Sequence, residues 1–199
     1  MNRSTIVSLC WLIILSTFIF SCENKNQESS DNLKSDSLMI KYVALQDSVK
    51  SNWETMIADD DRKHVLMNRL LLEVSYTNNY DKDRFNELKA QIDQLKSIRY
   101  DQNSMKNSFL IDQYDSMTWN VSDQIIEFAR SHPRYVDFPM MEELIQDINA
   151  KNNFILIHRI HYDNWAKELN LFSKDNEEQL KERNPDYKDG DMPLFQLPS

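Results

Sequence analysis

The sequence predicts an all-α fold, an antiparallel four-helix bundle whose first and fourth helices are long. Three observations support this prediction. The 199 residues include one glycine and five prolines, so few positions would end a helix. Apolar residues recur every three or four positions along most of the chain, which is the spacing of one helix face. Short polar stretches divide this pattern into segments, as in a bundle with tight connections.

The first helix is expected from Leu38 to Val74, with Asp36 or Ser37 as its N-cap. At 1.5 Å per residue, this helix would be about 55 Å long. Its inner face would contain Leu38, Tyr42, Leu45, Val49, Trp53, Met56, Asp60, His64, Met67, Leu70 and Val74. The polar stretch from 78 to 81 would end the helix and form a turn.

Two shorter helices follow. The second carries Phe85, Leu88, Ile92, Leu95 and Ile98 on one face, and its pattern ends in the polar stretch from 100 to 103. The third carries Leu110, Tyr114, Met117, Val121, Ile125 and Phe128 on one face. It would stop at His132-Pro133, because the residue before a proline disfavours helical backbone.

The fourth helix is expected to open at Pro139, which is tolerated only in the first turn, and to continue to about Arg183. Its inner face would contain Met141, Leu144, Ile148, Ile155, Tyr162, Ala166 and Leu169. The bundle would thus occupy residues 37–184, and Pro185 and Gly190 predict an irregular tail from 185 to 199.

The N-terminal segment predicts a lipoprotein signal peptide over residues 1–21. Its apolar run from Ile6 to Phe20 would be about 22 Å long, short of the ~30 Å hydrocarbon core of a bilayer. The residues Ile19-Phe20-Ser21-Cys22 resemble a bacterial lipobox, so Cys22 would become the acylated N-terminus. An uncleaved anchor and ordinary secretion are the alternatives. Because Cys10 would leave with the signal peptide, the mature chain would have no free thiol.

Residues 22–36 contain one apolar residue, Leu33, and predict a flexible tether between the lipid and the bundle. We therefore expect the protein in the cell envelope, at the outer membrane or the outer leaflet of the inner membrane. The formal net charge of −9 argues against nucleic acid or anionic headgroups as the main partner. With its one glycine at position 190, the chain cannot form glycine-flanked nucleophile or phosphate loops. We expect no catalytic residues and no cofactor.

The stretch from 125 to 170 resembles the C-terminal half of LemA-type envelope proteins. Pro133, Leu144, Asn153, Arg159, Tyr162 and Asn170 fall at the matching places without a gap. Residues 49–74 are similar to the family's first helix, with a basic pair at Arg62-Lys63. Asn68-Arg69 departs from the family's Pro-Asn, and Asp163 stands where the family has Asn. The resemblance implies a helical bundle tethered at a membrane outside the cytoplasm, and it supplies no catalytic residues.

Three groups of residues are candidates for a specific role. His158 and His161 share a helix face and would bind a metal ion if His64 supplied a third ligand, although solvated or hydrogen-bonded histidines are the commoner outcome. Asp60 lies on an otherwise apolar face, which predicts a buried ion pair with Arg159 across the bundle.

The tail is the third candidate. Its apolar residues Leu194, Phe195 and Leu197 would either dock back onto the bundle or bind a partner. The three tryptophans at 53, 119 and 165 are expected to fill the core. Taken together, the sequence predicts a non-enzymatic envelope lipoprotein that acts as an adaptor for protein partners. The alternative is a small-ligand or metal-binding module that uses the His158/His161 region.

Overall fold

A computed structural model describes residues 24–188 and 190–195 of the chain, with side chains from residue 37 onward. Every regular element in this part is helical, which confirms the all-α prediction. The α-helices are α2 (Asn24–Ser75), α3 (Lys82–Ile98), α4 (Ser108–Arg130), α5 (Pro139–Asp175) and α6 (Glu177–Arg183). Two short 3₁₀ helices, η1 (Ser104–Lys106) and η2 (Tyr135–Asp137), lie in connections. The predicted signal peptide and the acylation site Cys22 lie outside the described residues.

The chain divides into two compact units, Met1–Ala44 and Leu45–Ser199, and α2 contributes to both. In the first unit, the described residues belong to α2 alone. Their helical backbone corrects the prediction of a flexible tether over 22–36. The physical reason is that 24–75 contains neither glycine nor proline, so nothing interrupts the helix on the N-terminal side of Leu38. The rest of the molecule, described below, belongs to the second unit.

The turn between α2 and α3 depends on an asparagine and an aspartate. Asn78 has a φ of 62°, a left-handed conformation that asparagine tolerates better than other non-glycine residues. Asp81 then caps α3 by accepting a hydrogen bond of 2.9 Å from the backbone N–H of Arg84. Both positions lie at or near the predicted turn.

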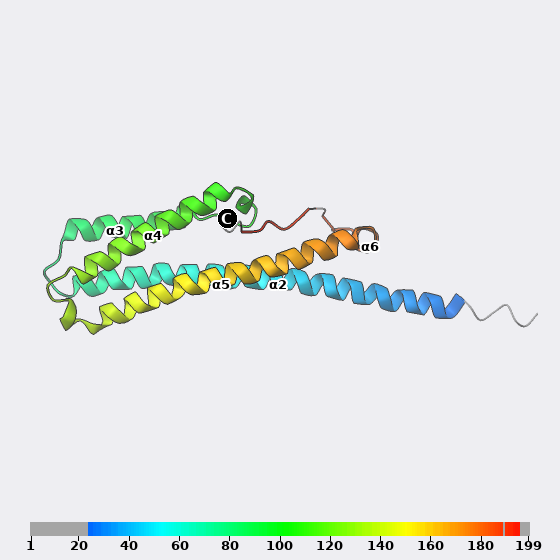
Figure 1. Ribbon diagram of the computed structural model, residues 1–199, viewed down its shortest axis with the longest axis horizontal. Coiled ribbons are helices and arrows are strands. Elements are labelled where there is room, and N and C mark those ends of the chain that lie inside the picture. Colours follow the sequence, from blue (N-terminus) through cyan, green and yellow to red (C-terminus); the bar gives the residue numbers. More distant parts are fainter. Residues whose placement is uncertain (1–23, 189, 196–199) are drawn as a thin grey trace, which may run out of the picture. The chain divides into compact units, whose positions relative to one another are not determined.

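The connections 99–107 and 131–138 are somewhat longer, and the chain reverses direction at each one, so that α4 lies beside both α3 and α5 (Figure 1). The Asn107 side chain caps α4 by accepting from the N–H of Phe109 at 3.2 Å. Pro139 occupies the first turn of α5, as predicted. Asn176 interrupts the predicted fourth helix: its backbone leaves the helical region, with φ −122° and ψ 20°, and a separate helix, α6, begins beyond it.

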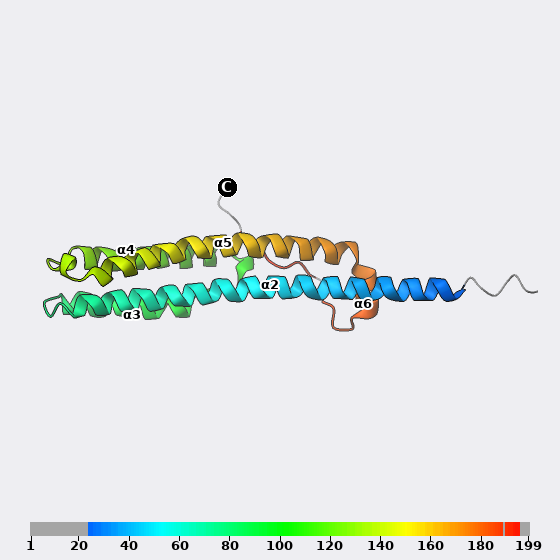
Figure 2. The same cartoon turned by 90° about the horizontal axis from the view of Figure 1, so that it is seen from below.

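The core of the second unit is formed by the predicted inner faces of α2, α3, α4 and α5. Figure 2 shows the arrangement of these helices from a second direction. Its fully buried members include Met67, Leu70, Val74, Leu88, Ile92, Leu95, Ile125, Met141, Ile148 and Tyr162. The tryptophans differ from expectation, since Trp119 is 55% and Trp165 38% exposed. Trp119 follows the buried Thr118 in the chain, and Trp165 precedes the buried Ala166. Because successive side chains in a helix are rotated by about 100°, the side chain next to a buried position points toward solvent.

Candidate functional site

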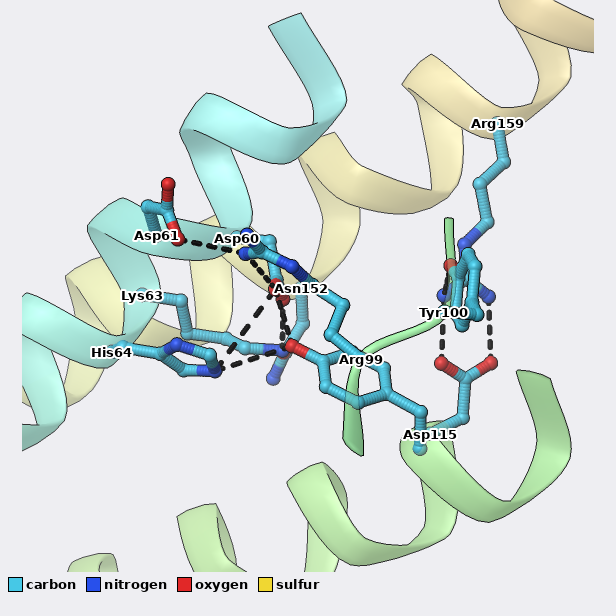
Figure 3. A network of polar contacts seen from close by, with 10 residues as sticks. Asp60, Asp61, Lys63, His64, Arg99, Tyr100, Asp115, Asn152 and Arg159 are labelled. Carbon is cyan, nitrogen blue, oxygen red and sulfur yellow. Dashed lines mark hydrogen bonds and ion pairs between the residues drawn. The ribbon is translucent and has the colours of Figure 1, made fainter. Parts of the chain in front are cut away.

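A layer of polar side chains crosses the otherwise apolar core of the second unit, centred on Asp60 of α2 (Figure 3). The Asp60 carboxylate is 4% exposed. Arg99, the residue that follows α3, donates from Nη1 to Asp60 Oδ2 at 3.1 Å and to Asp61 Oδ1 at 2.7 Å. The hydroxyl of Tyr114, on α4, also donates to Asp60 Oδ2. Because the two donors come from α4 and from the end of α3, the carboxylate links these two elements to α2.

Lys63 extends this layer toward α5. Its Nζ lies 3.7 Å from Asp60 Oδ1 and donates to Asn152 Oδ1 at 3.2 Å. The side chain is buried, and burial lowers the pKa of its ammonium group despite the nearby Asp60 carboxylate. Lys63 is therefore a buried cation that shares its nearest anion with Arg99.

A second polar group lies beside the first and joins α5 to α4. The Arg159 guanidinium forms a forked pair with Asp115, with both N–O distances at 2.6 Å, and it donates to the Tyr100 hydroxyl at 2.9 Å. The predicted ion pair between Asp60 and Arg159 is thus wrong. Asn152 is the α5 residue that faces Lys63, and Arg159 lies seven residues further along α5, about 10 Å away along the helix axis.

His64 is buried against the same layer, with 1% of its surface exposed. Its Nε2 lies 3.2 Å from the Tyr114 oxygen, whose proton is donated to Asp60, so Nε2 must carry the hydrogen of this bond. The other ring nitrogen, Nδ1, is buried with no hydrogen-bond partner among the described residues. A second proton there would have no acceptor. Burial therefore lowers the pKa of His64, although the Asp60 carboxylate opposes this shift.

The lowered pKa of His64 predicts a loss of stability on acidification. As the pH falls below the ordinary value of 6.5, the unfolded chain binds a proton that the folded chain does not, so the free energy of unfolding decreases. The loss is about 1.4 kcal/mol per pH unit until the folded pKa is reached. His64→Gln keeps a donor for Tyr114 and removes this loss. Urea unfolding of both proteins between pH 7.5 and 5 measures the difference, and parallel pH profiles would contradict the prediction.

The three histidines proposed as metal ligands do not converge. His64 contacts Tyr114, whereas His158 Nε2 lies 3.1 Å from Asp59 Oδ2, and His161 is exposed. Lys151 also bonds the Asp59 carboxylate, at 2.5 Å. Among the residues that the structure describes, no group of three histidine, cysteine or acidic side chains is arranged to hold a metal ion. His158 is thus a hydrogen-bonded residue next to an acid on α2.

The tail folds back onto the helices and is held by both its backbone and its side chains. The N–H of Phe195 donates to Asp163 Oδ1 at 2.9 Å, and the backbone of Met192 exchanges two hydrogen bonds with the Asn170 side chain, at 2.7 and 2.9 Å. The hydroxyl of Tyr162 donates to the carbonyl of Pro193 at 3.1 Å. Burial raises the pKa of the Asp163 carboxyl, and the Phe195 N–H partly opposes that shift.

The ring of Phe195 completes an aromatic cluster and is 6% exposed. Its centroid lies 6.4 Å from Trp53, 5.9 Å from Tyr100 and 5.6 Å from Tyr162. The Arg159 guanidinium lies 5.0 Å from the centre of the same ring. Of the two alternatives for the tail, docking onto the bundle or binding a partner, the structure shows Phe195 docked. Leu194 is half-buried, and Leu197 lies outside the described residues.

The outer surface of α5 carries exposed apolar side chains. We call this set the outer α5 surface; it consists of Phe154, Leu156, Ile157, Ile160 and Trp165, which are 38% to 49% exposed.

No helix in the described part of the chain combines the length and the apolar character that crossing a bilayer requires.

Comparisons with known proteins found no matching family model, no similar curated protein and no similar solved structure.

Proposed function

We propose that this protein is a lipid-anchored component of the bacterial envelope, in which an antiparallel four-helix bundle acts as a non-catalytic adaptor and binds a protein partner through the outer α5 surface. The observation that carries the proposal is the exposure of five large apolar side chains on one helix. Several large apolar side chains exposed on one helix mark an interaction site more often than singly scattered ones do.

The sequence of α5 makes this exposure unusual. The seven residues from 154 to 160 read FILIHRI, so apolar side chains point in almost every direction around the helix. A helix that is apolar on all sides is normally buried on all sides. Here Ile155 packs in the core, while Phe154 and Leu156 on either side of it are 47% and 49% exposed. A bound partner that covers the outer face would remove this surface from water.

The envelope location rests on the N-terminal residues. The lipobox-like Ile19-Phe20-Ser21-Cys22 supports acylation of Cys22, and the resemblance to LemA-type proteins supports a site of action at a membrane outside the cytoplasm. Several acyl chains on one residue hold a protein stably, at about 0.8 kcal/mol per buried methylene. The outer membrane and the outer leaflet of the inner membrane are both compatible with this anchor.

The proposal is tested by site-specific photocrosslinking of the full chain in membranes. A photoreactive phenylalanine analogue at Ile157 is expected to form a covalent adduct of one size. The same analogue at Asn86, an exposed position on α3, is the matched control and should form none. Ile157→Asp places a charge in the interface and should reduce recovery of the partner about tenfold, the effect of a 1.4 kcal/mol loss. Absence of any adduct from the outer α5 surface would refute the adaptor function.

The anchor is tested in the same membranes. Cys22→Ser should move the protein from the membrane fraction to the soluble fraction and remove the acyl groups from its N-terminal peptide, as measured by mass spectrometry. Cys10→Ser is the matched control, because that cysteine lies inside the predicted signal peptide and should leave both properties unchanged. A membrane-bound Cys22→Ser protein with an intact N-terminus would show that the anchor is not a lipid on Cys22.

A further inference from the structure

A cavity of about 350 Å³ lies between α2, α4, α5 and the tail. Its volume falls at the small end of the range for sites that bind small molecules. The residues that decide its chemistry are Lys63, Asp115, Trp119, Leu156, Arg159 and Phe195. Because the docked tail supplies Phe195, the cavity is complete only when the tail is in place.

Two cationic groups in the cavity wall have unused capacity to donate hydrogen bonds. Two nitrogens of Arg159 bond Asp115 and Tyr100, but its Nε is buried and has no partner among the described residues. Lys63 donates a hydrogen bond to Asn152. Its nearest carboxylate oxygen, at 3.7 Å, belongs to Asp60, which also accepts hydrogen bonds from Arg99 and Tyr114. An oxygen ligand would thus find N–H donors in this wall, next to the acceptors Asp115 and Asn152, which already bond Arg159 and Lys63.

The charges around the cavity favour an anion over a cation. Both oxygens of the Asp115 carboxylate already accept hydrogen bonds from Nη1 and Nη2 of Arg159, so this carboxylate has little capacity left to bind a cation. The remaining carboxylate of the lining, Asp112, is exposed at the rim, where water and salt screen it. Burial is the largest cause of the lowered pKa of Lys63; among the nearby charges, Asp60 and Asp115 raise this pKa and the Arg159 guanidinium lowers it. A bound anion would relieve this repulsion between the two cations.

The rest of the wall is apolar and lies on the same helices. Trp119, which is 55% exposed, and Leu156, which is 49% exposed, stand at the open side, with Ile111 and Ile155 deeper in the wall. We propose that the cavity binds a small organic carboxylate, with its oxygens at Lys63 and Arg159 and its apolar body against Trp119 and Leu156. Leu156 also belongs to the outer α5 surface, but binding of the carboxylate needs neither the lipid anchor nor a protein partner, so the purified chain tests this site separately from the adaptor function.

The proposal is tested by isothermal titration calorimetry of the full chain in detergent with benzoate and hexanoate as probes. Benzamide and benzylamine are the matched neutral and cationic analogues of benzoate. We expect at least one carboxylate to bind with one-to-one stoichiometry, with benzamide at least tenfold weaker and benzylamine weaker still. Failure of both carboxylates to bind, or equal affinity for benzoate and benzamide, would overturn the proposal.

Variants locate the site. Lys63→Met removes the charge but keeps the length of the side chain, and it should weaken binding at least tenfold, whereas Lys89→Met at an exposed position of α3 should not. Leu156→Trp fills the open side without touching either cation, and since Leu156 is half-exposed this variant should fold. This variant should not bind the carboxylate, and adding the carboxylate should not change its tryptophan fluorescence. Unaltered binding in the folded Leu156→Trp variant would show that the carboxylate binds elsewhere.

Discussion

Replacing Asp60 with alanine is expected to lower the free energy of unfolding by about 3 to 5 kcal/mol, the cost of removing one partner from a buried ion pair. The carboxylate is 4% exposed and receives bonds from Arg99 and Tyr114. Without it, the buried Lys63 ammonium loses its nearest anion, and the Tyr114 hydroxyl loses its acceptor. Urea unfolding monitored by circular dichroism measures the loss.

Asp61→Ala is the matched control for this experiment. Asp61 pairs with the same guanidinium, at 2.7 Å, but its side chain is 52% exposed. Because water screens such a pair, its removal should cost less than about 1 kcal/mol. The double variant Asp60→Ala/Lys63→Met should recover part of the loss in stability, since it removes Lys63, one of the two cations that lose the Asp60 carboxylate; the other is Arg99. Equal losses for the two aspartate variants would mean that burial does not govern the strength of this layer.

Arg159→Met is expected to cost about 3 kcal/mol and to loosen the tail. The methionine keeps the apolar packing of the arginine stem, but the forked pair with Asp115 is lost. The Asp115 carboxylate, 30% exposed in the wild-type fold, then loses the cation that pairs with it among the described residues. The guanidinium also contacts the ring of Phe195, so the tail loses one of its attachments. Urea unfolding measures the first effect, and amide hydrogen exchange of Met192 and Phe195 measures the second.

Arg62→Met provides the comparison, because Arg62 is an exposed residue of α2 and its loss should change the free energy of unfolding by less than about 0.5 kcal/mol. The tail amides should exchange at the wild-type rate in that variant. If Arg159→Met destabilised the protein while the Phe195 amide stayed protected, the tail would be held by Asp163 and Asn170 without help from the guanidinium.

The helices could be predicted from the sequence because their apolar positions repeat with a helical period that depends on no distant residue. The prediction that Asp60 and His64 lie on the inner face of the first helix was also confirmed, since helical spacing alone places them there. The same reasoning failed for the tether and at Asn176. A polar segment without glycine or proline is compatible with both coil and helix, and asparagine occurs both inside a helix, at Asn52 and Asn68, and at a helix end, at Asn176.

The partners within the polar layer could not be predicted in the same way. Arg99 and Tyr100 lie where the second helix loses its pattern, so the sequence indicated a loop and gave no direction for their side chains. Asp115 adjoins the inner-face residue Tyr114 on α4, and only the tertiary packing brings it to Arg159. The sequence did identify Asp60 and Arg159 as buried charges in need of partners. The sequence could not show that Asp60 and Arg159 would pair with other residues instead of with each other.

The layer around Asp60 has a consequence for how the helices settle against one another along their axes. Apolar stripes repeat about every seven residues, so a helix that slid by about 10 Å would still meet apolar neighbours. The charged side chains do not repeat in this way. In a slipped arrangement Asp60 would face hydrocarbon, Arg99 and Tyr114 would lose their acceptor, and Lys63 would lose its bond to Asn152 on α5. One cluster of charges in the second unit thus favours a single alignment among several that apolar contacts alone would permit.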